Sequence, residues 1–159
     1  MILVECLPDK VLVCELIKRR KIVKHGRGKG NIARLLEMHL TGTIAIIDED
    51  PGAPEPRYLA KLKLLENDTK NSITIKEDPT RKNLVIILSP RLEEWLLLAL
   101  KESNVNPKDI KLPRDPGVLH DLLTHNPQKV RTILKFTTRS KRIQKLRQII
   151  SRLPDSAPR

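Results

Sequence analysis

The sequence predicts an α/β fold: a parallel sheet with helices on both faces, followed by a basic helical C-terminal segment. Three observations indicate this class. Short apolar runs typical of buried strands alternate with helical segments over the first fifty residues. A strong apolar run at residues 83–88 is followed by another helical segment. After residue 117, apolar residues recur at helical spacing.

The N-terminal third supplies most of the predicted sheet. Residues 2–4 form a short, continuously apolar strand, and Pro8 lies at the start of the helix that follows. Residues 22–23 are a second strand. A glycine-rich turn then leads to Asn31, the expected N-cap of a helix to about residue 40. Residues 43–47 are a third strand, and because the strands are joined through helices, we expect them to be parallel.

The middle of the chain carries weaker patterns. Residues 57–67 are expected to be helical, and residues 73–75 to form a short edge strand. Residues 83–88 form a buried strand. Ser89 is then the expected N-cap of a helix to about residue 103, with Pro90 at its first position.

The length corresponds to about one domain, here with a C-terminal helical region beside it. We expect an α/β domain over residues 1–104 and a proline-dotted connector over 105–116. Two or three basic helices over 117–153 should lie on or beside that domain, and residues 154–159 should form a flexible tail.

The composition indicates a polyanionic partner. The 159 residues carry a formal net charge of +12, which favours nucleic acid first and an anionic membrane surface second. Only Trp95, Tyr58 and Phe136 are aromatic, so stacking of successive bases on rings is disfavoured. No apolar run approaches the ~20 residues of a membrane-spanning helix, so no membrane association is expected. With two isolated cysteines and no secretory leader pattern, we expect a cytoplasmic protein with reduced thiols.

The basic residues are concentrated in two acid-free stretches. The N-terminal basic block, residues 16–36, holds eight Lys and Arg residues, and the C-terminal basic block, residues 122–154, holds nine. Two such blocks indicate contacts to phosphates. Phosphate contacts carry no sequence information, and we favour DNA over RNA as the partner. The candidate nucleic-acid-binding residues are Arg19, Arg20, Lys21, Arg27, Lys29, Lys141, Arg142 and Lys145.

Acidic residues follow two of the predicted strands. Glu5 ends the first strand, and Asp48 and Asp50 follow the third. Ligands of open parallel sheets bind at the carboxyl ends of the strands, so these carboxylates are expected at the functional edge. Oxygen donors of this kind suit Mg²⁺, with Mn²⁺ as a substitute. Taken alone, residues 48–50 are more typical of a polar turn after a strand.

Three motifs in order resemble the TOPRIM domain, which is shared by topoisomerases, bacterial primases, recombination-repair proteins and OLD-family nucleases. The motifs are Val4-Glu5 with Asp9 four positions after the glutamate, the turn Gly28-Lys29-Gly30-Asn31, and the strand that ends in Asp48-x-Asp50. The turn is most similar to that of OLD-type and small stand-alone members. The resemblance covers about residues 1–60 and, less specifically, residues 83–103.

The resemblance implies a Rossmann-like TOPRIM sheet and a role for each matching residue. Glu5 would be the general acid/base or metal-ligating glutamate, and Asp48 and Asp50 the Mg²⁺-binding pair. Asp9 would cap the first helix, and Glu94 would be a further metal ligand.

Two functions are therefore expected. The first is Mg²⁺-dependent cleavage or processing of nucleic-acid phosphodiesters by a small TOPRIM nuclease, with Glu5, Asp48 and Asp50 as catalytic residues. The alternative is a non-catalytic nucleic-acid-binding subunit of a repair, primase or defence complex. A nucleotide-binding regulator ranks third. The sequence predicts no oligomeric state, and a protein partner in a larger assembly fits either function.

Overall fold

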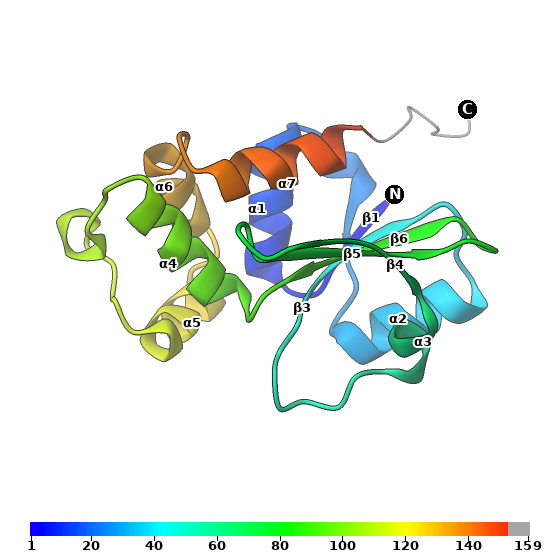
Figure 1. The fold of residues 1–159 in the computed structure, drawn as a ribbon. Coiled ribbons are helices and arrows are strands. Elements are labelled where there is room, and N and C mark those ends of the chain that lie inside the picture. Colours follow the sequence, from blue (N-terminus) through cyan, green and yellow to red (C-terminus); the bar gives the residue numbers. More distant parts are fainter. Residues whose placement is uncertain (153–159) are drawn as a thin grey trace.

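The computed structural model describes residues 1–152 and has an α/β fold (Figure 1). In this part of the chain, six strands form one mixed sheet in the order β2-β1-β3-β6-β5-β4, accompanied by seven α-helices. The predicted α/β class is confirmed. The predicted tail at residues 154–159 lies outside the described residues.

The first half of the sheet is parallel, as the sequence predicts. It consists of β2 (Val23–His25), β1 (Ile2–Val4), β3 (Ile44–Asp48) and β6 (Asn83–Leu88). Apolar side chains fill both faces of β1, β3 and most of β6, because helices cover the sheet on each side. The parallel pairing brings the carboxyl ends of these strands to one edge of the sheet.

The other half of the sheet is antiparallel, and here the prediction of a wholly parallel sheet is wrong. α3 covers only Arg57–Lys61, not residues 57–67, and the chain continues as the edge strand β4 (Lys63–Asp68). β5 (Ile73–Asp78) is longer than predicted and lies inside the sheet, antiparallel to both β4 and β6.

The turn between β4 and β5 explains the difference. The Asp68 carboxylate accepts hydrogen bonds from the backbone and side-chain nitrogens of Asn71, at 3.0 and 2.8 Å. This turn closes a hairpin, and β5 then pairs with β6 along its whole length. Pairing with β5 overrides the helical preference predicted for residues 62–67. Reasoning from the local sequence uses only that preference and does not include the pairing.

Five helices share a core with one face of the sheet: α1 (Leu7–Ile17), α4 (Leu92–Glu102), α5 (Pro116–His125), α6 (Lys129–Phe136) and α7 (Lys141–Ser151). Figure 1 shows α1 and α7 along the sheet and α4, α5 and α6 gathered at one end. Their apolar side chains form a single core with the sheet, in which Leu12, Leu119 and Leu146 are fully buried. The helices that follow residue 116 therefore pack directly on α1 and α4. Two short 3-10 helices, η1 (Arg20–Ile22) and η2 (Pro107–Ile110), lie in connections.

The opposite face is covered by α2 (Lys29–Met38) and α3. Ile32 and Leu36 of α2 and Leu59 of α3 are buried against β3 and β6. Buried Asn83 at the start of β6 closes this side: its amide donates hydrogen bonds to the carbonyls of residues 36 and 40, at 3.1 and 3.0 Å.

The predicted N-cap at Ser89 is wrong. α4 begins at Leu92, and Arg91 is its N-cap. Ser89 and Pro90, joined by a cis peptide bond, lie in the preceding turn. The backbone N–H of Ser89 still donates to the Ser72 carbonyl at 3.0 Å, so the chain follows the β5 pairing past the end of β6 before the helix starts.

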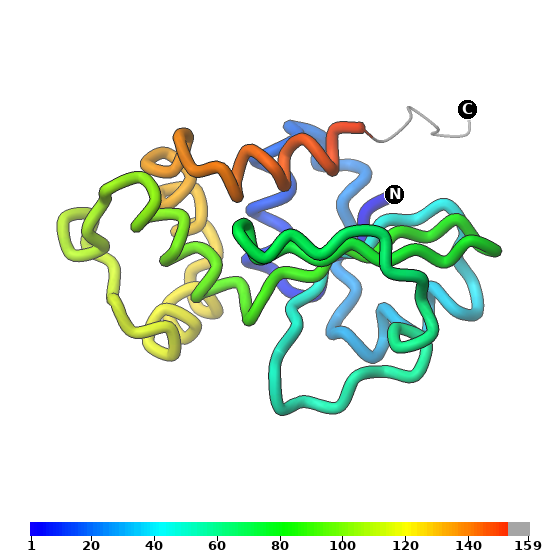
Figure 2. Tube along the Cα trace, in the orientation of Figure 1, coloured from blue at the N-terminus to red at the C-terminus, as the bar shows by residue number. Residues whose placement is uncertain are grey.

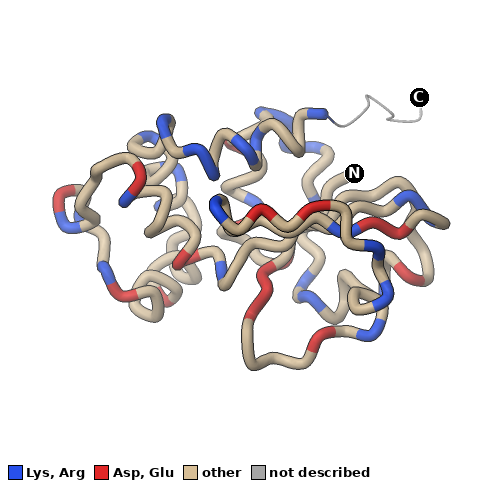
Figure 3. The backbone as a smooth tube through the Cα atoms, in the orientation of Figure 1, with Lys and Arg blue, Asp and Glu red and all other residues tan. Residues whose placement is uncertain are grey.

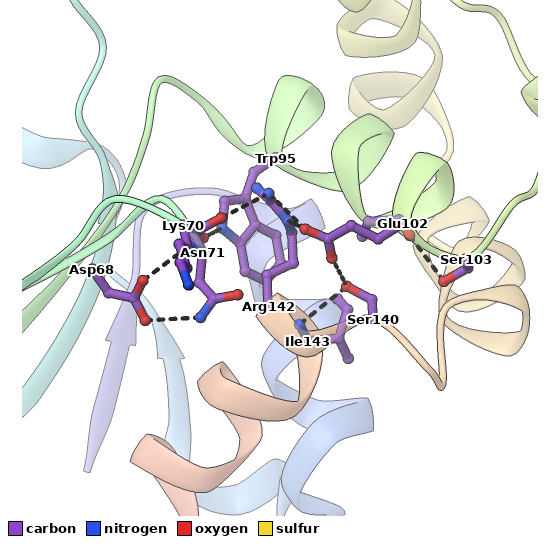
Figure 4. A network of polar contacts seen from close by, with 10 residues as sticks. Asp68, Lys70, Asn71, Trp95, Glu102, Ser103, Ser140, Arg142 and Ile143 are labelled. Atoms are coloured by element: carbon purple, nitrogen blue, oxygen red, sulfur yellow. Dashed lines mark hydrogen bonds and ion pairs between the residues drawn. The ribbon is translucent and has the colours of Figure 1, made fainter.

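A buried polar network joins the β4–β5 turn, α4 and α7 (Figure 4). Arg142 is only 4% exposed; its guanidinium donates to Glu102 at 2.8 Å and to the Lys70 carbonyl at 3.3 Å. Its charge lies 5.9 Å from the centroid of the Trp95 ring, whose Nε1 donates to the Asn71 carbonyl at 2.9 Å. The prediction that Arg142 binds nucleic acid is wrong for this fold, because its guanidinium is used inside the protein.

Among residues 1–152, no helix combines the length and apolar character that a membrane crossing requires.

Candidate functional site

Acidic side chains gather where β1, β3 and β6 end. Glu5 follows β1, Asp48 is the last residue of β3, and Glu93 lies in the first turn of α4, just beyond β6. Asp9, in the first turn of α1, lies beside them. We call these four residues the acid cluster. The edge is the one at which open parallel sheets bind ligands.

Glu5 and Asp48 are joined directly. Glu5 Oε2 accepts a hydrogen bond from the backbone N–H of Asp48 at 3.1 Å. This contact holds the ends of β1 and β3 together and fixes the Glu5 carboxylate against the Asp48 residue. The structure thus brings together two of the three predicted catalytic carboxylates.

Asp48 is the most strongly perturbed acid of the cluster. Its pKa is raised to about 9, first by burial and then by the negative charges of Asp9, Glu5 and Glu93, although a hydrogen bond from the backbone of Leu92 acts in the opposite direction. Asp48 Oδ1 is buried and has no hydrogen-bond partner. This side chain is therefore a desolvated carboxyl that neighbouring acids repel.

Asp9 caps α1, as predicted, and also belongs to the cluster. Its Oδ2 accepts hydrogen bonds from the backbone N–H and the Sγ of Cys6, at 3.1 and 3.0 Å. Its other oxygen, Oδ1, is buried without a partner. The pKa of Asp9 is raised to about 7: burial is the main cause, the charges of Glu5 and Glu93 add to it, and the hydrogen bonds from Cys6 oppose it.

Glu93, and not Glu94, faces the cluster. Glu93 is 5% exposed, and its charge acts on both Asp9 and Asp48. Its Oε1 lies 2.9 Å from Nδ1 of His120 on α5. Glu94 lies on the next position of the helix, with a buried Oε2 that has no partner. The sequence prediction named Glu94 as a further metal ligand, and it is the neighbouring Glu93 whose charge acts on Asp9 and Asp48.

Asp50 is turned to a different partner. Its carboxylate lies 3.4 Å from Nε of Arg91, and the side chain is about half exposed. The residue has a φ of 52°, and its backbone N–H donates to the Pro90 carbonyl at 2.9 Å. The chain then makes the wide excursion of residues 51–56 that Figure 2 shows before α3 begins. Asp50 is thus paired with Arg91, while it lines the same pocket as Asp48.

The glycine-rich turn between β2 and α2 folds over the end of β1. The backbone N–H of Gly26 donates to the Val4 carbonyl at 2.7 Å, and that of Gly28 donates to the Glu5 carbonyl at 3.1 Å. A Cβ on Gly26 would lie only 2.3 Å from Cγ1 of Ile32, so only glycine fits there. The turn thereby fixes the backbone that carries Glu5.

Asn31 has a different structural role from the predicted one. Gly28, with a φ of 98°, is the N-cap of α2, and Asn31 is the third residue of the helix. Its side-chain amide donates to the Gly26 carbonyl at 2.7 Å and so closes the turn from inside. Lys29 Nζ donates to the Glu49 carbonyl at 2.8 Å, which ties the turn to the segment after β3.

A small pocket opens beside Asp48 on the α2–α3 side of the sheet. It has a volume of about 250 Å³, and its charged lining residues are Lys29, Asp48, Glu49, Asp50 and Glu55. The pocket lining therefore combines one cationic residue with four acidic ones.

The predicted basic residues divide into exposed and occupied ones. Arg19, Arg20, Lys21, Arg27 and Lys141 are exposed. Lys29 is held by the Glu49 carbonyl, and Lys145 forms ion pairs with Glu66 and Asp68. Figure 3 shows basic residues on α6 and α7, while acidic residues follow β3 and begin α4.

The two basic blocks meet between α1 and α6. Arg20 of the N-terminal block and Arg131 of the C-terminal block both lie near Glu15, at 4.0 and 2.9 Å. A pocket of about 370 Å³ between the two helices is lined by Arg20, Arg131 and Lys10. Leu7, the first residue of α1, also lines it. The acid cluster begins at the same end of α1, so a cationic hollow lies along the helix that carries Asp9.

The chemistry of the acid cluster fits a hard divalent cation. Two buried carboxylate oxygens, on Asp9 and Asp48, lack partners, and burial, together with the charges of neighbouring acids, raises the pKa of both groups. In residues 1–152, no group of three or more acidic, His or Cys side chains lies so that it could hold a metal ion. Mg²⁺ does not need one, because it is usually held by one or two carboxylates, waters and substrate phosphates.

No family model, no curated protein and no solved structure matches this chain. The resemblance to TOPRIM domains remains a prediction from the three sequence motifs.

Proposed function

We propose that the protein is a Mg²⁺-dependent enzyme that cleaves or processes nucleic-acid phosphodiesters, with the acid cluster as its centre. The observation that carries this proposal is the buried, unpartnered Oδ1 of Asp48, which lies beside Glu5 and Asp9 at the carboxyl edge of the sheet. A carboxylate in that position is costly unless a proton or a cation neutralises it. Buried carboxyl groups with raised pKa values at the ligand-binding edge of a sheet are typical of a metal-dependent active site.

Glu5 and Asp48 are the residues that would hold the cation, with Glu93 next to them. When bound, a divalent cation neutralises the charge of a phosphodiester and lowers the pKa of water that attacks it. Asp9 would stay as the cap that holds the start of α1 and adds negative charge. Asp50 can join from its present position, because an ion pair as exposed as that with Arg91 contributes only ~0–1 kcal/mol.

The exposed cations of the N-terminal basic block support a nucleic-acid substrate. Arg20, Lys21 and Arg27 are exposed, and the turn that carries Arg27 also contacts the Glu5 backbone. A phosphate backbone that crosses these residues would therefore reach the acid cluster. Both DNA and RNA offer such a backbone, and DNA is our preferred substrate. The cytoplasmic location and a protein partner remain predictions of the sequence.

The experiment is a cleavage assay on supercoiled plasmid, single-stranded DNA and RNA, each with Mg²⁺, Mn²⁺ or chelator. We expect metal-dependent cleavage that is at least ~100-fold slower in Glu5→Gln and Asp48→Asn, which is ~2.7 kcal/mol in activation free energy. Asp109→Asn is the matched control, since Asp109 is an exposed acid on η2 outside the cluster. Cleavage that survives both cluster substitutions would refute the proposed site.

A non-catalytic nucleic-acid-binding subunit is the second candidate. The contact between Asp50 and Arg91 favours it, because a cation of the protein already engages one of the two aspartates that the TOPRIM resemblance pairs. Salt-sensitive binding without cleavage under any metal would establish this alternative and exclude the first.

A further inference from the structure

We propose that the pocket between α1 and α6 is a binding site for a phosphomonoester group, with the organic part of the ligand packed against the apolar wall of the pocket. The four residues of the acid cluster do not line this pocket. The site uses cationic side chains of the protein and no metal ion. It therefore goes beyond the proposed cleavage activity and does not depend on it.

The pocket has the size and the lining of a small-molecule site. Its volume is about 370 Å³, within the ~300–1,000 Å³ that is typical of ligand pockets. Such pockets combine apolar walls with a few polar groups. The apolar lining residues here are Leu7, Val11, Cys14 and Pro127. The polar lining residues are Lys10, Arg20, Gln128 and Arg131.

Helical spacing explains the α1 side of the pocket. Leu7, Lys10, Val11 and Cys14 are three or four residues apart, so they lie on one face of α1. Leu7 is a large apolar side chain, yet it remains 49% exposed. An exposed apolar surface next to a cation suits an organic anion better than an inorganic one, because only the organic anion gains from covering it.

Three cations from three segments border the pocket, and none of its lining residues in the described part of the chain is acidic. Lys10 comes from α1, Arg20 from η1 and Arg131 from α6. Burial raises the pKa of the Cys14 thiol, and the charges of these three residues all oppose that rise. The three cations therefore lie around a thiol that itself lines the pocket.

The protein leaves much of this positive charge uncompensated. The Lys10 ammonium forms no hydrogen bond or ion pair with other residues of the described chain. Arg20 and Arg131 share the single carboxylate of Glu15, at 4.0 and 2.9 Å, and Lys18 donates to the same carboxylate at 2.8 Å. Nε of Arg131 is buried and has no hydrogen-bond partner, although it lies close to Glu15. One carboxylate shared by three cations cannot neutralise them.

A phosphomonoester matches this lining better than a phosphodiester does. At pH 7 it carries a charge of about −1.5 to −2 and has three acceptor oxygens, whereas each phosphodiester carries one negative charge. Guanidinium groups donate paired hydrogen bonds to phosphate oxygens, and a lysine adds a point charge. Two arginines and one lysine therefore suit all three oxygens. A free nucleotide and the phosphorylated end of a nucleic acid both present this group.

The test is an NMR titration of the isotope-labelled full chain in metal-free buffer of low salt. The probes are adenosine monophosphate and a terminally phosphorylated oligonucleotide. Adenosine and the same oligonucleotide without the terminal phosphate are the matched ligands. We expect both phosphorylated probes to shift the amide signals of α1 and of the start of α6. Each should bind at least ~10-fold more tightly than its unphosphorylated counterpart, which corresponds to the loss of one charge-assisted hydrogen bond or more.

Two lysines provide a matched pair of variants. Lys10 lines the pocket, whereas Lys108 is an exposed lysine on η2 that does not. Lys10→Gln should weaken binding of adenosine monophosphate at least ~10-fold. Lys108→Gln should leave it within about twofold, because salt screens a distant exposed charge. Thermal unfolding checks the fold of each variant, and since Lys10 has no partner inside the protein, we expect Lys10→Gln to fold normally.

Two further variants examine the arginine and the apolar wall. Arg131→Lys keeps the positive charge and should bind adenosine monophosphate more tightly than Arg131→Gln does. Leu7→Ala should weaken binding of adenosine monophosphate several-fold but leave the affinity for inorganic phosphate unchanged, because inorganic phosphate has no apolar part to cover.

The two sources of the phosphate group are separated by the probes. Adenosine monophosphate that binds as tightly as the phosphorylated oligonucleotide identifies a free nucleotide as the ligand. Tighter binding of the phosphorylated oligonucleotide identifies the end of a nucleic acid. Either result supports a phosphomonoester site.

Three results would overturn the proposal. The first is equal affinity for phosphorylated and unphosphorylated ligands, the second is equal binding by Lys10→Gln and Lys108→Gln, and the third is signal shifts confined to other elements. The cleavage assay is a separate measurement. Asp48→Asn should lose cleavage and still bind adenosine monophosphate, because Asp48 does not line the pocket. Either proposal can therefore fail while the other stands.

Discussion

The Glu5 carboxylate accepts a hydrogen bond from the backbone N–H of Asp48 at 3.1 Å, across the gap between two parallel strands. The contact links the end of β1 to the end of β3 and places a charged oxygen next to a carboxyl group that is itself buried. The titrations of the acids in the cluster are therefore coupled, because a change in the charge of one member changes the pKa of the others.

The stability of the metal-free protein should fall as the pH rises. The unfolded Asp48 loses its proton near pH 4, whereas the folded residue keeps it until about pH 9. The folded state therefore binds more protons between these values, so the free energy of unfolding decreases with pH across this window. Asp9, with a pKa of about 7, contributes with the same sign.

Asp48→Asn checks this dependence. The amide carries no charge at any pH, so the variant should lose stability less steeply between pH 5 and pH 9. At pH 8 in chelator it should unfold at least ~2 °C higher than the original protein, since ~1 kcal/mol shifts the midpoint of a domain of this size by about 2–4 °C. Thermal unfolding followed by circular dichroism measures both effects, with Asp109→Asn as the control. Parallel pH profiles for the original protein and Asp48→Asn would contradict the assignment.

Gly26 and Gly30 should respond oppositely to alanine. A Cβ at Gly26 would overlap Cγ1 of Ile32, so Gly26→Ala should cost ~1–3 kcal/mol, the range of overpacking. At Gly30, in the first turn of α2, a Cβ meets no atom within 4 Å, so Gly30→Ala should be neutral or stabilising by up to ~1 kcal/mol. Denaturant unfolding of both variants measures the difference. Equal effects at the two glycines would mean that the turn does not approach Ile32 as described.

Arg142→Met should destabilise the fold. The substitution keeps an apolar chain against Trp95 but removes the donors to Glu102 and to the Lys70 carbonyl. The loss should be about 1.5–3 kcal/mol, the usual value for a hydrogen bond to a charged group. Lys141→Met, at the exposed neighbour on α7, is the control and should change the free energy of unfolding by no more than ~0.5 kcal/mol. A substitution at Arg142 as mild as that at Lys141 would contradict the network.

Exposed cations and occupied cations should differ in nucleic-acid binding. Replacement of Lys21 and Arg27 by Gln should weaken binding to duplexes of unrelated sequence equally. It should also reduce the slope of log affinity against log salt by ~1 for each lost phosphate contact. Lys145→Gln should leave the slope nearly unchanged, because Lys145 is engaged by Glu66 and Asp68. Fluorescence anisotropy at several salt concentrations measures the slopes. An unchanged slope in the Lys21 and Arg27 variant would exclude this surface as the binding face.

The parallel half of the sheet could be predicted because its strands are continuous apolar runs. Residues 44–47 and 85–88 are buried on both faces, so they are apolar throughout, and this pattern can be recognised without knowledge of the neighbouring strands. β4 could not be predicted in the same way. Its side chains are exposed except at Asp68, and it exists because it pairs with β5. A strand that depends on its partner leaves little pattern of its own.

The acid cluster was predictable in part for a similar reason. Glu5 and Asp48 directly follow strands, so topology alone places them at one edge. Glu93 could have been found from helical spacing: it lies three residues before buried Leu96, whereas Glu94 lies four before exposed Leu98. His120 had no such signal, since its contact with Glu93 depends on how α5 packs on α4.

α1 has neighbours on both sides, the sheet on one and the C-terminal helices on the other, and Leu12 lies in the core that they share. A single cut by a protease in the connection at residues 105–116 would therefore leave two fragments that still need each other. The N-terminal fragment would expose the outer side of α1, and the C-terminal fragment would expose the inner sides of α5, α6 and α7. We expect a nicked chain to run as one species under native conditions and to separate only in denaturant. The acid cluster and the helix that carries His120 would remain in one noncovalent complex after the peptide bond in the connection is cut.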